Sequence, residues 1–296
     1  MKVLNFGSMN LDYVYTVDHM VQGGETLASS DRQVFFGGKG FNQSVALAKA
    51  GVPVYHAGMI GEDGKELLEM CREVGVNTEY VWVLPGSSGH TIIQVDKEGQ
   101  NSIILYGGAN QKQTKEYVDE VLSNFSEGDY IILQNEINLL DYIIDVAYSR
   151  GMKIVLNPSP FNEKLETCDF SKVSIFLINE IEGKQFTGYS DSDEVLDALW
   201  KRYPQSGIVL TLGGYGVYWY DGKHKVFQKS FPVKAVDTTA AGDTFTGYFI
   251  SEMIAEKTIL QCLYTASKAA AIAVSRQGAA QSIPVAEEVE KFNISV

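Results

Sequence analysis

The sequence predicts an α/β fold in which a mostly parallel sheet lies between two layers of helices, with a second, small β-sheet beside it. Short apolar runs alternate with helical stretches from one end of the chain to the other, which is typical of repeated βαβ units. Two pairs of β-rich runs break this alternation because no helical stretch separates their members. With 296 residues, 45% of them hydrophobic and 21% charged, the chain suits one large globular α/β domain.

Local patterns predict each element of the main body. Residues 2–6 form an apolar run that predicts the opening strand, and similar runs predict strands at 54–57, 130–133, 153–156, 174–178 and 208–212. Apolar residues at helical spacing predict helices at 41–50, 62–74 and 139–149. Two more helices are predicted at 244–254 and 260–275. The second of these contains five alanines, so it can pack closely against a neighbour.

The small sheet is predicted from two pairs of runs, 11–16 with 32–36 and 91–96 with 102–106. The second pair is joined by Lys97-Glu98-Gly99-Gln100, a hairpin-type connection. We interpret the two pairs as one separate sheet, inserted in two pieces; the alternative is an antiparallel extension of the main sheet. The predicted division is a body of residues 1–10, 37–84 and 108–296, and a small sheet of residues 11–36 and 85–107.

The net charge and the cysteine content limit which kinds of binding partner and which cellular compartment we expect. With 24 basic and 37 acidic residues the net charge is −13, which disfavours binding to a nucleic-acid backbone. The three cysteines have no disulfide or metal-binding spacing, which favours a reducing compartment. The first residues lack an apolar stretch of signal-peptide length, and no run of 18 apolar residues occurs. We therefore expect a cytoplasmic protein that binds neither a membrane nor nucleic acid.

The run Asp237-Thr-Thr-Ala-Ala-Gly-Asp243 is the first candidate for chemistry. Small residues lead into a predicted helix, whose free N–H groups attract anions such as phosphate. A carboxylate beside a phosphate is unfavourable unless it has a task, and accepting a hydroxyl proton during phosphoryl transfer is such a task. Asp243 is therefore a candidate general base, and the alternative is an ordinary helix cap.

Polar residues near the N-terminus suggest a site for a hydroxylated ligand. Gly37-Gly38-Lys39-Gly40-Phe41-Asn42 is neither a P-loop nor a dinucleotide fingerprint, and it suits either a ligand-contacting loop or a plain strand-to-helix turn. Asn10 and Asp12 follow the first strand at alternate positions, so both can bind vicinal hydroxyls, unless they form only a polar turn. Glu136 lies just past a predicted strand, where open α/β sheets bind ligands.

Two further segments follow predicted strands. Asn179 and Glu182 offer oxygen ligands that suit Mg²⁺, directly or through water; an N-capped surface helix is the alternative. The Gly-rich run 211–216 suits contact with a nucleotide or a plain hairpin.

In their order and combination, these motifs resemble the ribokinase family of phosphofructokinase-B-type carbohydrate kinases. The resemblance runs from Gly7-Ser-Met-Asn-Leu-Asp12 to Gly278-Ala-Ala-Gln-Ser282, with signature regions at 37–51 and 237–247. It implies ATP-dependent phosphorylation of a sugar, with ribose converted to its 5-phosphate as the first expectation. The alternatives are deoxyribose, fructose, another pentose or hexose, a nucleoside, or a sensor protein without activity. The intact Asp243 disfavours the sensor.

The resemblance also implies residue roles. Asp243 would be the base, with N–H groups of Ala240, Ala241 and Gly242 around the anion. The sugar would be held by Asn10, Asp12, Gly38, Lys39, Gly40, Asn42, Glu136 and Asp243. ATP would lie against Asn179, Thr211, Leu212, Gly213, Gly214, Tyr215, Gly216, Gly242 and Ser267. Glu182 would organise Mg²⁺ through water, and K⁺ or another monovalent cation would lie among Asp237, Thr239, Ala273, Arg276, Gly278 and Ser282.

The family fold implied is a three-layer body with a β-sheet lid, through which such kinases often form homodimers. Two residues depart from the family pattern. Phe41 stands where a small residue is expected, and Thr91 stands where a small apolar pocket wall is expected. Both departures bear on which sugar is bound more than on the reaction.

Overall fold

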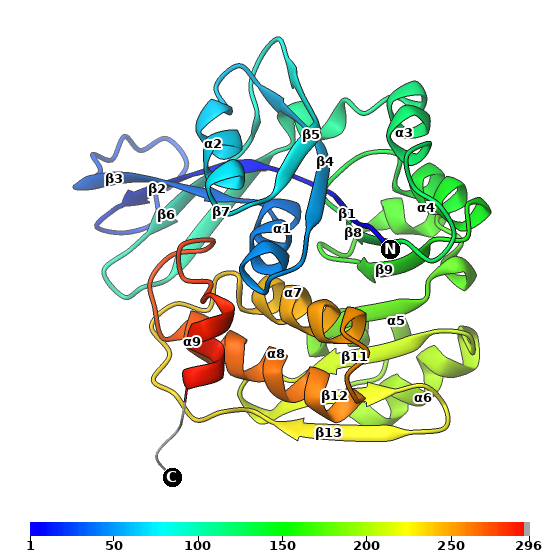
Figure 1. Cartoon of the computed structure of the whole chain (residues 1–296). Coiled ribbons are helices and arrows are strands. Elements are labelled where there is room, and N and C mark those ends of the chain that lie inside the picture. The colour runs from blue at the N-terminus through cyan, green and yellow to red at the C-terminus, as the bar shows by residue number, and fades with distance from the viewer. Residues whose placement is uncertain (293–296) are drawn as a thin grey trace.

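A computed structural model describes residues 1–292 and has the predicted α/β architecture (Figure 1). The main sheet has nine strands in the order β13-β12-β11-β10-β9-β8-β1-β4-β5. Their bounds are β1 Val3–Phe6, β4 Val54–Gly61, β5 Asn77–Leu84, β8 Tyr130–Gln134, β9 Lys153–Asn157, β10 Ile175–Asn179, β11 Gly207–Thr211, β12 Gly216–Tyr220 and β13 Lys225–Lys229. Neighbours are parallel from β11 to β5, whereas β12 and β13 are antiparallel. Strands β5, β12 and β13 were not predicted.

Helices cover both faces of the main sheet, because its strands bury alternate side chains on opposite sides. Val3 packs into one core and Leu4 into the other. The first core is covered by α1 Lys39–Lys49, α2 Lys65–Glu73, α7 Ala241–Ile254, α8 Ile259–Val274 and α9 Ala286–Lys291. The second is covered by α3 Lys115–Leu122, α4 Leu140–Ser149, α5 Glu180–Thr187 and α6 Ser192–Arg202.

Two predicted helix starts differ from the structure by three residues. Helix α2 begins at Lys65 rather than at residue 62, because a turn separates it from β4, which ends at Gly61. Helix α7 begins at Ala241 rather than at residue 244, so Asp243 lies inside its first turn. The second shift matters for the site, because it brings the candidate base into the helix itself.

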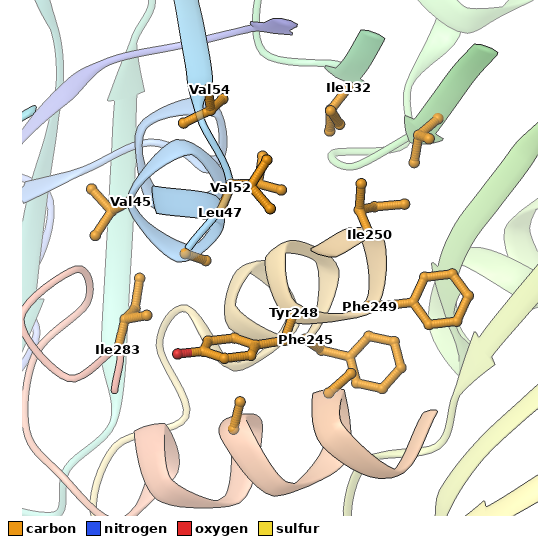
Figure 2. Packing of buried hydrophobic residues seen from close by; sticks show 14 of the residues in the cluster. Val45, Leu47, Val52, Val54, Ile132, Phe245, Tyr248, Phe249, Ile250 and Ile283 are labelled. Carbon is orange, nitrogen blue, oxygen red and sulfur yellow. The ribbon is translucent and has the colours of Figure 1, made fainter. Parts of the chain in front are cut away.

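Helix α7 is fixed in place by apolar packing on several sides (Figure 2). Phe245, Tyr248, Phe249 and Ile250 are buried in the same core as side chains of α1 and α8. The Tyr248 hydroxyl donates to the carbonyl of Pro284, 2.8 Å away. This packing holds the N-terminus of α7, and with it Asp243, in a defined position.

The small sheet is separate from the main sheet, as predicted, and the alternative of an extension was wrong. Its order is β3 Asp31–Gly37, β2 Asn10–Thr16, β6 Gly89–Val95 and β7 Asn101–Tyr106. Within residues 1–292, no helix combines the length and the apolar character that crossing a bilayer requires.

Candidate active site

A cavity of about 940 Å³ lies between the small sheet and the carboxyl ends of the main strands. It is lined by most of the predicted residues: Asn10, Asp12, Gly38, Lys39, Asn42, Glu136, Asn179, Glu182, Thr211, Asp237, Thr239, Ala240, Ala241, Gly242, Asp243 and Gly278. One face of the small sheet also lines it, and this face includes a row of register partners made of Phe35, Asp12, Thr91 and Leu105. Residues from both ends of the chain thus converge on one space.

Other predicted residues do not line the cavity: Gly40, Leu212, Gly213, Gly214, Tyr215, Gly216, Ser267, Ala273, Arg276 and Ser282. Gly40 has a packing role, since a Cβ there would lie 2.5 Å from the Ser8 nitrogen. Tyr215 is 81% exposed, and the Arg276 guanidinium pairs with Glu288 at 2.6 Å.

The start of α7 presents free backbone donors to the cavity. Ala240 has φ 59°, a left-handed conformation that is uncommon for a residue other than glycine. The N–H of Ala241 donates to the carbonyl of Thr238 at 3.3 Å. Among residues 1–292, the N–H groups of Ala240, Gly242 and Asp243 make no hydrogen bond. Such free donors at a helix N-terminus can bind an anion.

Asp243 is not a helix cap. Its carboxylate accepts hydrogen bonds from two side chains of α1 rather than from the backbone of α7. Asn42 Nδ2 donates to Oδ2 at 3.0 Å, and Gln43 Nε2 donates to Oδ1 at 2.9 Å. Asp243 is only 7% exposed yet lines the cavity, so its carboxylate is held in place beside the free N–H groups.

Asn10 and Asp12 are oriented by residues of other strands and turns. Asn110 Nδ2 donates to Asn10 Oδ1 at 2.7 Å, which leaves the Asn10 amide nitrogen as the donor for a ligand. The Thr91 hydroxyl donates to Asp12 Oδ1 at 2.6 Å. Burial raises the pKa of Asp12, and the hydrogen bond from Thr91 opposes this rise. A Cβ at Gly37 would lie 2.0 Å from Asp12 Oδ2, so a side chain at this position would displace the Asp12 carboxylate.

Glu136 and Lys39 place opposite charges in the cavity. Glu136 Oε2 accepts a short hydrogen bond from the Ser8 hydroxyl and one of 2.9 Å from the Lys39 N–H. Burial raises the pKa of Glu136. Burial alone would lower the pKa of Lys39, but the charges of Asp243, Glu136 and Glu182 outweigh it and raise the pKa. The Lys39 ammonium is therefore held in its charged form.

The first turn of α5 combines a cap with a cavity wall. Asn179 Oδ1 accepts from the Glu182 N–H at 2.8 Å, and Glu182 Oε2 accepts from the Asn179 N–H at 3.0 Å. Glu182 is nevertheless buried and faces the cavity. Because this cap uses one carboxylate oxygen, the other is available for a hydrated divalent cation, so the residues fit Mg²⁺.

Asp237 links two distant segments. Its carboxylate accepts from the Thr239 N–H at 2.9 Å and from the Gly278 N–H at 3.0 Å. Burial alone would raise the pKa of Asp237, but hydrogen bonding from the Thr239 side chain, together with these two N–H groups, holds it below its ordinary value. The loop after α8 is thereby tied to the segment that begins α7.

The sequence pattern that defines the pfkB family of carbohydrate kinases matches residues 1–286. The chain belongs to this family. It is 34% identical to the ribokinase of Haemophilus influenzae over 97% of its own length and 96% of that protein's, and 30% identical to the deoxyribokinase of Salmonella typhi over 99% and 98%. The solved structure of Arabidopsis thaliana ribokinase complexed with ribose and ATP matches with a TM-score of 0.86 at 28% identity, covering 99% of each chain. The prediction of a sugar kinase is confirmed.

In this kinase, the two departures from the family pattern differ in consequence. Phe41 is fully buried in the apolar core, with its ring 6.4 Å from that of Phe36, and does not line the cavity. Thr91 lines the cavity and contacts Asp12. Only Thr91 therefore bears on the choice of sugar.

Sequence reasoning missed three residues that orient the site: Ser8, Gln43 and Asn110. Ser8 lies within the motif at 7–12, and Gln43 directly follows Asn42, so proximity to the motifs was the only signal for them. Asn110 lies 100 residues from its partner Asn10, and no local pattern predicts such a contact.

Proposed function

We propose that the protein is an ATP-dependent ribokinase, which phosphorylates the 5-hydroxyl of D-ribose. The observation that carries this proposal is the polar lining of the cavity, where Asn10, Asp12, Asn42 and Glu136 line the same space as Asp243. We call these four residues the sugar end. Their mixed donors and acceptors suit a ligand with several hydroxyls, and the similarity to ribokinases supports ribose among the sugars.

In the proposed reaction, the ribose 5-oxygen attacks the γ-phosphorus of ATP while the Asp243 carboxylate accepts the hydroxyl proton. The bond from the γ-phosphorus to the bridging oxygen breaks, and ADP leaves. The free N–H groups of Ala240 and Gly242, together with the charged Lys39, would stabilise negative charge on the transferring group. Catalysis then consists of positioning and charge stabilisation.

The opposite wall of the cavity would take the nucleotide. We call Asn179, Glu182 and Thr211 the nucleotide end; all three line the cavity at the ends of β10 and β11 or just beyond. Glu182 would hold Mg²⁺ through water, and the cation would neutralise phosphate charge. Glu180 is the matched control, because it lies exposed in the same turn. Glu182→Gln should raise the Mg²⁺ concentration needed for half-maximal rate, and Glu180→Gln should not.

A sugar screen tests the ribose assignment. ADP release should be measured with ribose, 2-deoxyribose, fructose, other pentoses and hexoses, and nucleosides. A site built to bind a hydroxyl can reject an analogue that lacks it by up to about 10⁴–10⁵-fold, so ribose should exceed 2-deoxyribose in kcat/KM. Equal or better turnover of 2-deoxyribose, or activity only with a nucleoside, would contradict ribokinase and leave another sugar or nucleoside kinase.

A monovalent cation, K⁺ first, would bind near Asp237 and order the loop that precedes α7. K⁺ suits a set of carbonyl oxygens because it is large and weakly hydrated. KCl should therefore activate the enzyme relative to tetramethylammonium chloride at equal ionic strength, and Asp237→Ala should abolish the activation. Asp221→Ala is the matched control, since Asp221 also accepts two backbone N–H groups, in the β12–β13 turn. A flat response to K⁺, with Asp237→Ala fully active, would remove the site.

The small sheet would act as a lid over the body and as the interface of a homodimer in the cytoplasm, without nucleic-acid or membrane partners. The surface that supports this is the row Val34, Ile92 and Ile104, all at least 40% exposed and none lining the cavity. Ile104→Lys should halve the mass in light scattering. Ile181→Lys, at an equally exposed isoleucine on α5, should not. A monomeric unmodified protein would contradict the dimer.

A further inference from the structure

A chain of fully buried polar side chains runs from Asp243 into the protein beneath the cavity. Gln43, Gln134, Asn5, Ser44 and His56 each have 0% exposed surface. They come from α1, β8, β1 and β4, so four separate elements each contribute to the chain. Buried polar groups are costly unless hydrogen-bonded, so a line of five needs a physical reason.

The hydrogen bonds in this chain run outward from Gln134, which donates to both of its neighbours. Gln134 Nε2 donates to Asn5 Oδ1 at 2.9 Å and to Gln43 Oε1 at 2.7 Å. Because its carbonyl oxygen is occupied in this way, Gln43 must turn its NH₂ group toward Asp243 Oδ1, 2.9 Å away. The reverse orientation would place two oxygens together at Asp243 and two NH₂ groups together at Gln134. Gln134 thus selects the orientation in which Gln43 is a donor.

The far end of the chain fixes Asn5. Asn5 Nδ2 donates to the Gly40 carbonyl at 2.6 Å and to Ser44 Oγ at 2.8 Å, which leaves Asn5 Oδ1 as an acceptor for Gln134. Ser44 Oγ in turn lies 2.7 Å from His56 Nδ1. Burial lowers the pKa of His56 to about 4, so the ring is neutral and Nδ1 can accept the Ser44 proton. Every amide in the chain therefore has one assigned orientation.

We propose that Gln43, oriented by Gln134, is a positioning residue for the phosphoryl-transfer reaction. It holds Asp243 Oδ1 from a position that does not line the cavity, whereas Oδ2 accepts from Asn42, which does line it. Oδ2 is therefore the oxygen presented to the sugar hydroxyl. This inference rests on the proposed function, in which Asp243 is the base. Neither glutamine lines the cavity, so each acts through another residue and not on substrate.

The test compares Gln43→Met and Gln134→Met with the control Gln113→Met. Gln113 is also buried, at 4% exposure, and its side-chain amide has no partner among the described residues. Gln43→Met should lower kcat about 10–100-fold, less than the about 10²–10⁴-fold expected for loss of a base, and leave the ribose KM within about threefold. Gln134→Met should lower kcat about threefold to tenfold, because Gln43 keeps its amide but loses its fixed orientation.

A pH profile separates positioning from mere stability. A carboxylate that loses an N–H donor is protonated more easily, so the acid limb of kcat should move to higher pH in Gln43→Met and stay in place in Gln113→Met. Thermal unfolding shows whether Gln43→Met folds. If it does not fold, the comparison of Gln134→Met with Gln113→Met decides the test. Unchanged kcat and pH profiles in both variants, with Asp243→Asn inactive, would overturn the positioning role but not the kinase. An active Asp243→Asn would overturn the base and the positioning role together.

Discussion

The two ends of the cavity are built differently. At the sugar end, three of the four side chains are held by a second residue, Asn10 by Asn110, Asp12 by Thr91 and Glu136 by Ser8, and the fourth, Asn42, donates to Asp243. At the nucleotide end, Asn179 and Glu182 hold each other, and the Gly-rich turn that follows Thr211 lies in solvent. A Cβ at Gly214 or Gly242 would meet nothing within 4 Å.

The difference indicates where selectivity resides. Oriented, partly buried side chains reject a ligand whose hydroxyls do not match, because unpaired buried groups are costly. At the nucleotide end the turn at 213–215 is exposed, and the phosphates would bind to the free N–H groups of Ala240 and Gly242, which do not demand one particular base or sugar. We therefore expect substitutions at the sugar end to change activity far more than substitutions at the nucleotide end.

Asp243→Asn should have the largest effect. The variant keeps the size of the side chain but cannot accept the proton, so kcat should fall about 10²–10⁴-fold while ADP binding persists. Steady-state kinetics and calorimetric titration with ADP measure the two quantities. Retention of more than about a tenth of kcat would contradict the role of Asp243 as base.

Asp12→Asn should have the second-largest effect, which should appear as a higher ribose KM. Replacing the carboxylate removes a charged acceptor for sugar hydroxyls, and a hydrogen bond to a charged group contributes about 1.5–3 kcal/mol. The ribose KM should rise about 10–100-fold, and the ATP KM should stay within about twofold. If the two KM values rose equally, the division of the cavity into two ends would be wrong.

As the pH is lowered, ribose binding should weaken before ordinary carboxyl groups become protonated. Because burial raises the pKa of Asp12 and of Glu136, both protonate at a higher pH than an ordinary carboxyl, which titrates near about 4. Protonation removes acceptors, so the ribose KM should rise as pH falls through these raised values. A ribose KM that stays flat down to about pH 4 would contradict this account.

Thr91→Val tests the support beneath Asp12. The change keeps the shape and removes the hydroxyl that donates to Asp12 Oδ1. Loss of one neutral donor to a carboxylate should raise the ribose KM about threefold to tenfold. The ratio of kcat/KM for ribose to that for 2-deoxyribose should fall as well, and an unchanged ratio would show that Thr91 has no part in sugar choice.

Tyr215→Ala should have the smallest effect. The side chain is 81% exposed and outside the cavity, although the family resemblance assigns it to ATP. We expect the ATP KM to change less than about threefold, because an exposed ring has little to lose on truncation. A tenfold rise would mean that the nucleotide end is more selective than its geometry indicates.

The sequence was most informative where a local pattern carries the structure. Short apolar runs predicted most of the parallel strands, and the small residues before Asp243 predicted a helix start close to where α7 begins. The start of α7 was misplaced because Ala240 and Ala241 carry no strong signal, and only the left-handed backbone at Ala240 defines the boundary. Partners such as Gln134 and Asn110 could not be predicted, because their contacts join elements roughly a hundred residues apart.

One structure determination would test the central claim, that the cavity has a sugar end and a nucleotide end that meet at Asp243. Crystals should be grown with ribose, ADP and Mg²⁺. The account predicts the ribose ring hydroxyls on Asn10, Asp12 and Glu136, and the 5-hydroxyl within hydrogen-bond distance of Asp243 Oδ2, with ADP against Asn179 and Thr211. Ribose bound elsewhere, or with its 5-hydroxyl directed away from Asp243, would contradict it.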